Sequence, residues 1–184
     1  MLRHVGTGEA SHTMVNVMDN LVFVDCGASG PCVGKGELTE FGAVAWRTRE
    51  TFHRVLVESR PRVEKPELSD VVGARHDAHA VYAVYAAFAG WLSAVCPDRL
   101  IFVSDNPAFD WQWINHRFHR TLDRNPFGHS ARRISDVSAG LMGDFTTSMG
   151  WKRLRVTPTA HDHNPVHDAM GNVEAFERRL RGER

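Results

Sequence analysis

The sequence predicts an α/β fold in which helices cover the faces of a mixed sheet. Apolar, β-branched segments recur in the first third of the chain, and the short polar join between the second and third of them indicates antiparallel neighbours. Helical and strand patterns alternate after them, an order typical of a sheet flanked by helices. We therefore expect three antiparallel strands followed by alternating helices and strands.

The first half of the chain supplies most of the sheet and one long helix. Residues 20–26, 38–46 and 51–57 are predicted strands because they are apolar and rich in β-branched residues. Residues 58–75 carry many charges and three helix breakers, which predicts a surface loop. Residues 76–95 are rich in alanine and place large apolar residues at helical spacing, so we expect a helix whose mainly aromatic stripe packs in the core: Tyr82, Tyr85, Phe88, Trp91 and Leu92.

The second half adds two short strands and three helices. Residues 99–104 are a short apolar strand, and Asn106-Pro107 then supplies an N-cap and a first-turn proline for a helix to about residue 120. A brief strand is expected at residues 132–135 and a helix from Asp136. A second Asn-Pro pair, Asn164-Pro165, begins the last helix.

Composition limits the function classes. Lys plus Arg equals Asp plus Glu at 22 each, so no bulk positive field attracts nucleic acid or a membrane, and a phosphate ligand must be held locally. The three cysteines lack metal-site spacing, which suits reduced thiols. No apolar run approaches the roughly 20 residues that span a bilayer. We expect a cytoplasmic protein without membrane contact.

The domain organisation is expected to be simple. Residues 1–17 are polar and aperiodic, so we interpret them as a disordered leader or an expression tail. Residues 18–184 have the length of one domain.

Three carboxylates mark separate predicted elements. Asp25 ends the first strand, where α/β sheets bind ligands, and Asp110 and Asp168 each lie one turn inside a helix begun by Asn-Pro. The simpler interpretation is that the two helical acids only stabilise helix N-termini. Together, however, the three could bind divalent cations, and Mg²⁺ leaves coordination positions for substrate phosphate.

The segment HDHNPVH contains three histidines. A zinc site is one use of such a cluster, but no cysteine lies nearby in the sequence. His163 lies five residues before Asp168, so it could take a proton from an attacking water as a general base. His161 and His167 are expected to face solvent or to make local hydrogen bonds.

These residues resemble a known family. VFVD followed by LTEFGAV, then SDNPAFDW and HNPVHDAMGN, is similar to the three motifs of the DnaQ-like DEDDh 3'-5' exonucleases, which have a ribonuclease H-like fold. The resemblance covers residues 20–180. By position, Asp25, Asp110, His163 and Asp168 match the motif residues. The family's first-motif Glu falls on Gly27.

The resemblance implies a reaction and a ligand set. Two Mg²⁺ or Mn²⁺ ions would be held by Asp25, Asp110 and Asp168, with Asp25 shared between them, and His163 would deprotonate the attacking water. The product would be a nucleoside 5'-monophosphate released from a 3' end. We expect a single-stranded substrate, RNA slightly ahead of DNA, because the domain is small and shows no additional duplex-binding module in its sequence. Substrate contacts are expected at the first-motif turn and in the first half of the second-motif helix, from Gly27, Ala28, Ser29, Asn106, Phe109 and Trp113. For Trp113 the alternative is packing in the core.

Gly27 leaves the activity in question. Glycine offers no oxygen, so we expect weak or absent hydrolysis with retained binding of 3' ends, whether Gly27 is natural or an inactivating change. Glu40 on the next strand is a replacement carboxylate that we expect less, because the family often carries Glu there. Five basic residues could guide a single-stranded nucleic acid through phosphate contacts, or they could simply form a solvated surface: Arg132, Arg133, Lys152, Arg153 and Arg155. The alternatives are a non-catalytic 3'-end-binding module and a proofreading-type partner subunit, and a homodimer is left open.

Overall fold

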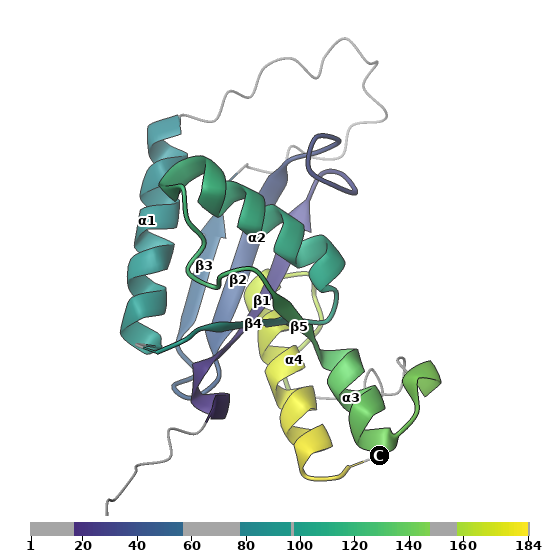
Figure 1. Ribbon diagram of the computed structural model, residues 1–184. Coiled ribbons are helices and arrows are strands. Elements are labelled where there is room, and N and C mark those ends of the chain that lie inside the picture. The colour runs from purple at the N-terminus through teal and green to yellow at the C-terminus, as the bar shows by residue number, and fades with distance from the viewer. Residues whose placement is uncertain (1–16, 57–77, 97, 148–157, 184) are drawn as a thin grey trace, which may run out of the picture.

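A five-stranded mixed sheet forms the centre of the fold (Figure 1). The structure is a computed structural model, and it describes residues 17–56, 78–96, 98–147 and 158–183. The strand order is β3-β2-β1-β4-β5. The first three strands are antiparallel neighbours, while β4 and β5 run parallel to β1. The strands are β1 (Leu21–Ala28), β2 (Leu38–Ala45), β3 (Thr51–Val55), β4 (Ile101–Ser104) and β5 (Ala131–Arg133).

Within these described residues, four α-helices cover the two faces of the sheet. The helices α1 (Ala78–Val95) and α2 (Pro107–Leu122) pack on one face. The helices α3 (Ile134–Met142) and α4 (Pro165–Leu180) pack on the other. Two short 3-10 helices are η1 (Val17–Asn20) and η2 (Phe145–Thr147). The predicted α/β class and mixed sheet are confirmed, and the arrangement is consistent with a ribonuclease H-like fold.

The alternation of side chains along β1 divides the core in two. Val22, Val24 and Cys26 point to the face that α1 and α2 cover, and we call the apolar cluster there the first core. Leu21 and Phe23 point to the face that α3 and α4 cover, and the cluster there is the second core. Asp25 and Gly27 continue the second series along β1, since side chains two residues apart share a face. Asp25 and Gly27 therefore lie on the face of the sheet that α4 covers.

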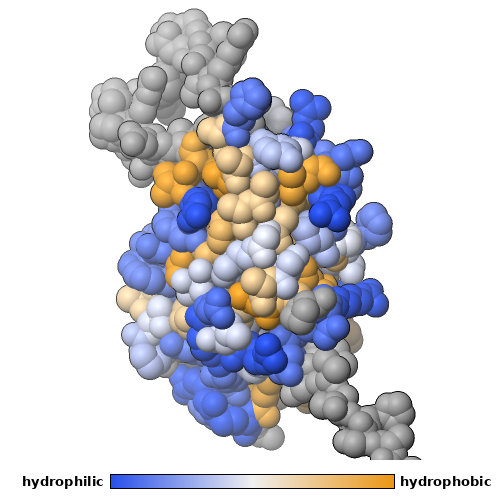
Figure 2. Space-filling model, turned by 90° about the vertical axis from the view of Figure 1, so that its left-hand side faces the viewer, coloured by the Kyte–Doolittle hydropathy of each residue, from blue (hydrophilic) through white to orange (hydrophobic). Residues whose placement is uncertain are grey.

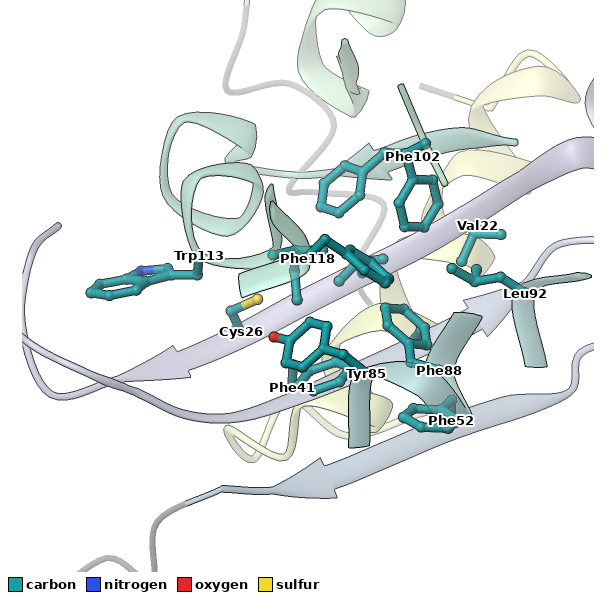
Figure 3. Packing of buried hydrophobic residues seen from close by; sticks show 14 of the residues in the cluster. Val22, Cys26, Phe41, Phe52, Tyr85, Phe88, Leu92, Phe102, Trp113 and Phe118 are labelled. Atoms are coloured by element: carbon teal, nitrogen blue, oxygen red, sulfur yellow. The ribbon is translucent and has the colours of Figure 1, made fainter. Parts of the chain in front are cut away.

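The aromatic stripe of α1 fills the first core (Figure 3). Phe88 packs against Phe41 with ring centroids 5.0 Å apart and against Phe52 at 4.8 Å. Tyr85 stacks on Phe41 at 5.6 Å. The core prediction is confirmed for these α1 residues and wrong for Tyr82, which is 52% exposed because it lies on the outer side of the helix.

The outer side of α1 carries few polar groups. Its exposed positions are mostly alanines, and Figure 2, which views the molecule from this side, shows a pale apolar band between blue margins. No helix among the described residues is long and apolar enough to cross a membrane.

Two predictions about helix starts need correction. The helix α3 begins at Ile134 rather than Asp136, because Ile134 is buried in the second core, so the preceding strand ends at Arg133. Asn106 precedes α2 but its side chain makes no capping hydrogen bond, since its backbone (φ −134°, ψ 73°) has an irregular conformation. Asn164 does cap α4, accepting a hydrogen bond from the backbone N–H of Val166 at 3.0 Å.

Several sequence predictions fall outside the described residues. They concern most of the predicted leader, all of the predicted loop and three basic residues: 1–16, 58–75, Lys152, Arg153 and Arg155.

Candidate active site

Three carboxylates meet where β1 extends past β4. The ladder between these parallel strands ends at the pair of Phe23 and Val103, so Asp25 lies beyond it on β1. Asp105 follows β4 directly, and Asp110 lies in the first turn of α2. One carboxylate oxygen of each lies within 4.8 Å of the others, and we call Asp25, Asp105 and Asp110 the carboxylate cluster. The predicted meeting of Asp25 and Asp110 is thus present in the structure.

Asp110 is the most buried member of the carboxylate cluster. It is 2% exposed, and its Oδ1 accepts a hydrogen bond from the backbone N–H of Cys26 at 3.2 Å, which ties α2 to β1. Its Oδ2 is buried and has no hydrogen bond of ordinary geometry from the described residues. Burial raises the pKa of the Asp110 carboxyl to about 7, although the Ser104 side chain lies close enough to oppose this rise. The bond to Cys26 shows that Asp110 does more than stabilise a helix N-terminus.

The cluster fits a hard divalent cation. It offers only oxygen ligands, which Mg²⁺ and Mn²⁺ favour over nitrogen or sulfur. Buried polar atoms are nearly always partnered, and the Asp110 Oδ2 atom has no partner at ordinary hydrogen-bond geometry among the described residues. A cation bound by Asp110 and its two neighbours would supply that partner and offset their mutual repulsion.

Asp168 belongs to a second group that also contains His161 and His163. Ligand atoms of the three lie within 4.8 Å of one another. Asp168 is 4% exposed in the first turn of α4, while both histidines are exposed. His161 Nδ1 lies 2.5 Å from Asp168 Oδ1, and the two imidazole rings are 4.8 Å apart. The predicted pair of His163 and Asp168 is brought together, with His161 making the direct hydrogen bond.

Local hydrogen bonds hold the loop before α4. Asp162 accepts one from the backbone N–H of Asn164 at 3.0 Å, and its other oxygen lies 2.9 Å from His167 Nδ1. His163, between them, has a left-handed backbone with φ 64°. Such a conformation is uncommon for a residue other than glycine, and this kind of strain tends to occur at functional sites.

Gly42 connects the two groups. It is the cross-strand partner of Asp25 on β2, and a Cβ placed on it would lie 2.4 Å from the backbone N of Val166. Only glycine allows the first turn of α4 to approach β2 so closely. Because Asp168 lies in that turn, α4 brings the second group to the same end of the sheet as Asp25.

Gly27 and Glu40 face each other across β1 and β2. A Cβ placed on Gly27 would lie 2.9 Å from Glu40 Cγ and 3.4 Å from Glu40 Oε1. The other carboxylate oxygen of Glu40, Oε2, lies 3.3 Å from His53 Nε2. The space beside Gly27 on this face is therefore occupied by the Glu40 side chain from the neighbouring strand.

The predicted substrate contacts occupy different environments. Ala28 ends β1, and Ser29 is exposed, with its Oγ accepting a hydrogen bond from the Glu37 backbone N–H at 2.9 Å. Asn106 is exposed and Phe109 is half-buried. Trp113 is 2% exposed in the first core, where it packs edge-on against Phe109. This burial favours the core-packing alternative for Trp113.

Sequence reasoning missed Asp105, and it expected a local hydrogen bond for His161 without naming Asp168 as the partner. Asp105 follows a predicted strand directly, as in the argument for Asp25, so the same rule could have found it. The choice of His161 as the partner of Asp168 depends on the loop conformation, and the sequence spacing gives no signal for it.

Near the carboxylate cluster, the Nε–H of Arg133 donates a hydrogen bond to the backbone oxygen of Asp105 at 3.1 Å.

Fold and site together define an α/β protein with a carboxylate site suited to divalent cations. No protein-family profile matches the chain. The chain is 30% identical over 173 residues to the 3'-5' DNA exonuclease Cap18 of Escherichia coli, and the match covers 84% of this chain and 88% of that protein. The chain therefore belongs to this 3'-5' exonuclease family, which confirms the exonuclease family expected from the motifs.

Proposed function

We propose that this chain is a metal-dependent 3'-5' exonuclease of the DEDDh type, which releases nucleoside 5'-monophosphates one at a time. The observation that carries the proposal is the Asp110 carboxylate, buried beside Asp25 and Asp105 with no ordinary hydrogen bond to its Oδ2 from the described residues. The second group, around Asp168, lies at the same end of the sheet because of the close approach at Gly42. Membership of an exonuclease family supports the same reaction.

The residues have separate roles in this proposal. Asp25, Asp110 and Asp168 would hold two Mg²⁺ or Mn²⁺ ions, with Asp105 as an additional oxygen ligand. Bound divalent cations supply charge neutralisation of the scissile phosphate and acidify water. His163 takes a proton from the attacking water at a ring nitrogen, for which its exposed position leaves access. His161 orients the Asp168 carboxylate through the bond at 2.5 Å.

The substrate proposed first is the 3' end of single-stranded DNA. The relative is named a DNA exonuclease, so we place DNA before RNA, although the sequence alone had favoured RNA slightly. Ser29 and Asn106 are exposed and Phe109 is half-buried, so all three are open to contact with a substrate. Exposed Arg133, held beside Asp105, is suited to a phosphate contact.

A labelled oligonucleotide assay tests this function. Single-stranded DNA and RNA of one sequence, labelled at the 5' end, are incubated with Mg²⁺, Mn²⁺ or EDTA and separated by length. We expect a ladder that shortens from the 3' end, depends on metal, and stops at a 3'-terminal phosphorothioate block. Cleavage inside a blocked strand, or unchanged cleavage in EDTA, would contradict the proposal.

A non-catalytic 3'-end-binding module is the second candidate function. Gly27 favours it, because glycine supplies no ligand at the position where the family carries Glu. This candidate predicts binding of 3' ends with weak or absent hydrolysis. It requires that no other carboxylate takes the place of the missing Glu.

A further inference from the structure

We propose that Gln112 is a positioning residue for substrate binding, which holds the loop between β1 and β2 in the conformation that takes the 3'-terminal nucleotide. We call residues 29–37, between Ala28 at the end of β1 and Leu38 at the start of β2, the β1–β2 loop. The inference rests on the proposed function, in which Ala28 and Ser29, where the loop leaves β1, contact the substrate. It is carried by hydrogen bonds that close the loop and fix it to α2.

The two ends of the β1–β2 loop are joined to each other. The backbone N–H of Ser29 donates to the Glu37 oxygen at 2.9 Å, and Ser29 Oγ accepts from the Glu37 N–H at 2.9 Å. Beside them, a Cβ placed on Gly36 would lie 2.5 Å from the backbone N of Gly30. Two backbones approach this closely only where neither residue carries a side chain. The conformation of Ser29 therefore depends on how the loop is held.

One side chain of α2 holds the middle of the loop. Gln112 Oε1 accepts a hydrogen bond from the backbone N–H of Val33 at 3.1 Å, and its Nε2 lies 3.4 Å from the Pro31 oxygen. Nε2 also donates to the Ala108 oxygen within α2 at 3.0 Å. A glutamine amide offers both donors and an acceptor, so one side chain can bind both kinds of backbone group. Gln112 thus fixes the middle of the loop against α2.

An ion pair makes a second connection between the loop and α2. Arg117 on α2 pairs with Glu37 at the end of the loop, and the Glu37 side chain is 59% exposed. An ion pair this open to solvent contributes little to stability. We therefore assign the larger part of the positioning to Gln112.

The same helix connects the loop to the carboxylate cluster. Gln112 lies two residues after Asp110, and Asp110 binds the backbone N–H of Cys26, which lies two residues before Ala28 on β1. The strand, the loop and α2 thus form a closed ring of contacts. A loop that is already held in its binding conformation loses less conformational freedom when the ligand binds. Gln112 should therefore affect the affinity for the 3' end and leave metal binding unchanged.

The experiment compares the wild type with Gln112→Met, which nearly keeps the length of the side chain and removes its polar groups. Gln112→Glu, the conservative variant, keeps an acceptor for the Val33 N–H. Asn115→Ala is the matched control, because it removes from α2 a side chain that accepts a hydrogen bond from Asn125 at 2.9 Å and not from the loop.

Four quantities are measured for each protein. Hydrogen exchange of residues 29–37 reports how firmly the loop is held, and calorimetry gives the Mn²⁺ affinity. Anisotropy gives the Kd for labelled single-stranded DNA with a 3'-terminal phosphorothioate block. Steady-state hydrolysis of the unblocked strand gives kcat and KM separately.

We expect Gln112→Met to speed exchange in the loop and to raise Kd and KM about 5 to 10-fold, the usual effect of one or two lost hydrogen bonds. The Mn²⁺ affinity and kcat should stay within about twofold. A change that only destabilises the fold lowers the amount of folded enzyme, and hence kcat, without raising KM. Gln112→Glu should recover part of the affinity, and Asn115→Ala should keep the wild-type KM. Should Gln112→Met not fold, Arg117→Gln, which removes the second connection, should raise KM about twofold.

Unchanged Kd and KM in Gln112→Met, or an equal rise of both in Asn115→Ala, would overturn this inference and leave the proposed function in place. A wild type that neither binds nor shortens a 3' end would instead overturn the proposed function together with this inference.

Discussion

His161, rather than His163, makes the direct hydrogen bond to Asp168, with 2.5 Å between Nδ1 and Oδ1. The two imidazole rings lie 4.8 Å apart, so both reach the same carboxylate region. The arrangement suggests that one histidine orients Asp168 while the other stays available for proton transfer. Substitution of each histidine can separate these two roles.

His163→Ala is expected to lower the single-turnover rate about 100-fold, the usual size of a general-base contribution. His161→Ala should reduce the rate less and raise the Mn²⁺ concentration needed for half activity, because it removes an orienting bond. Rates measured against pH and Mn²⁺, with exposed His129→Ala as control, check this. A larger loss in rate for His161→Ala would make His161 the base.

Asp110 gives the metal-free protein a pH-dependent stability. Burial raises its pKa in the folded state to about 7 from an ordinary 3.8, so the folded state holds this proton more tightly than the unfolded state. Its contribution to the free energy of unfolding is full below about pH 4 and is lost as pH rises through 7.

Urea unfolding in EDTA at pH 5 and pH 8 measures this effect. The wild type should lose stability between these values by about 1 kcal/mol or more, and Asp110→Asn should lose clearly less. Adding Mn²⁺ at pH 8 should restore the wild type, since the cation binds the deprotonated carboxylate. Equal pH dependence of both proteins would contradict the assignment.

Gly42→Ala is expected to destabilise the fold by about 1 to 3 kcal/mol and to reduce activity. The added Cβ would lie 2.4 Å from Val166 N and 2.5 Å from Pro165 C, and the backbone there cannot give way without moving α4. Gly90→Ala on α1 is the matched control, because its Cβ would meet nothing within 4 Å. Chemical denaturation should show Gly90→Ala stabilised by about 0.5 to 1 kcal/mol.

Asp105→Asn is expected to weaken Mn²⁺ binding, because it removes one charge from three oxygens that lie within 4.8 Å of one another. Asp136→Asn, an exposed change on α3, is the matched control. Calorimetric titration with Mn²⁺ compares the two variants. Equal affinities in both would place Asp105 outside the metal site and leave it as a loop residue.

Local patterns were sufficient to predict the sheet, its helices and three acids at defined ends of elements. The apolar run that leads to Asp25 and the two Asn-Pro helix starts are short-range signals, so the positions of Asp25, Asp110 and Asp168 followed from them. What was missed depends on tertiary contacts. The Glu40 side chain lies beside Gly27 because of the register between β1 and β2. The hydrogen bond between His161 and Asp168 depends on the conformation of the loop before α4.

Release of nucleoside 5'-monophosphate from the 3' end of single-stranded DNA, followed by mass spectrometry, tests the central claim most directly. The wild type and Asp25→Asn are compared at equal folded concentration with Mn²⁺ and with EDTA. The account predicts mononucleotide release by the wild type with Mn²⁺ and a loss of at least about 100-fold in Asp25→Asn and in EDTA. Equal release by both proteins, or release that persists in EDTA, would contradict a metal-dependent exonuclease centred on Asp25.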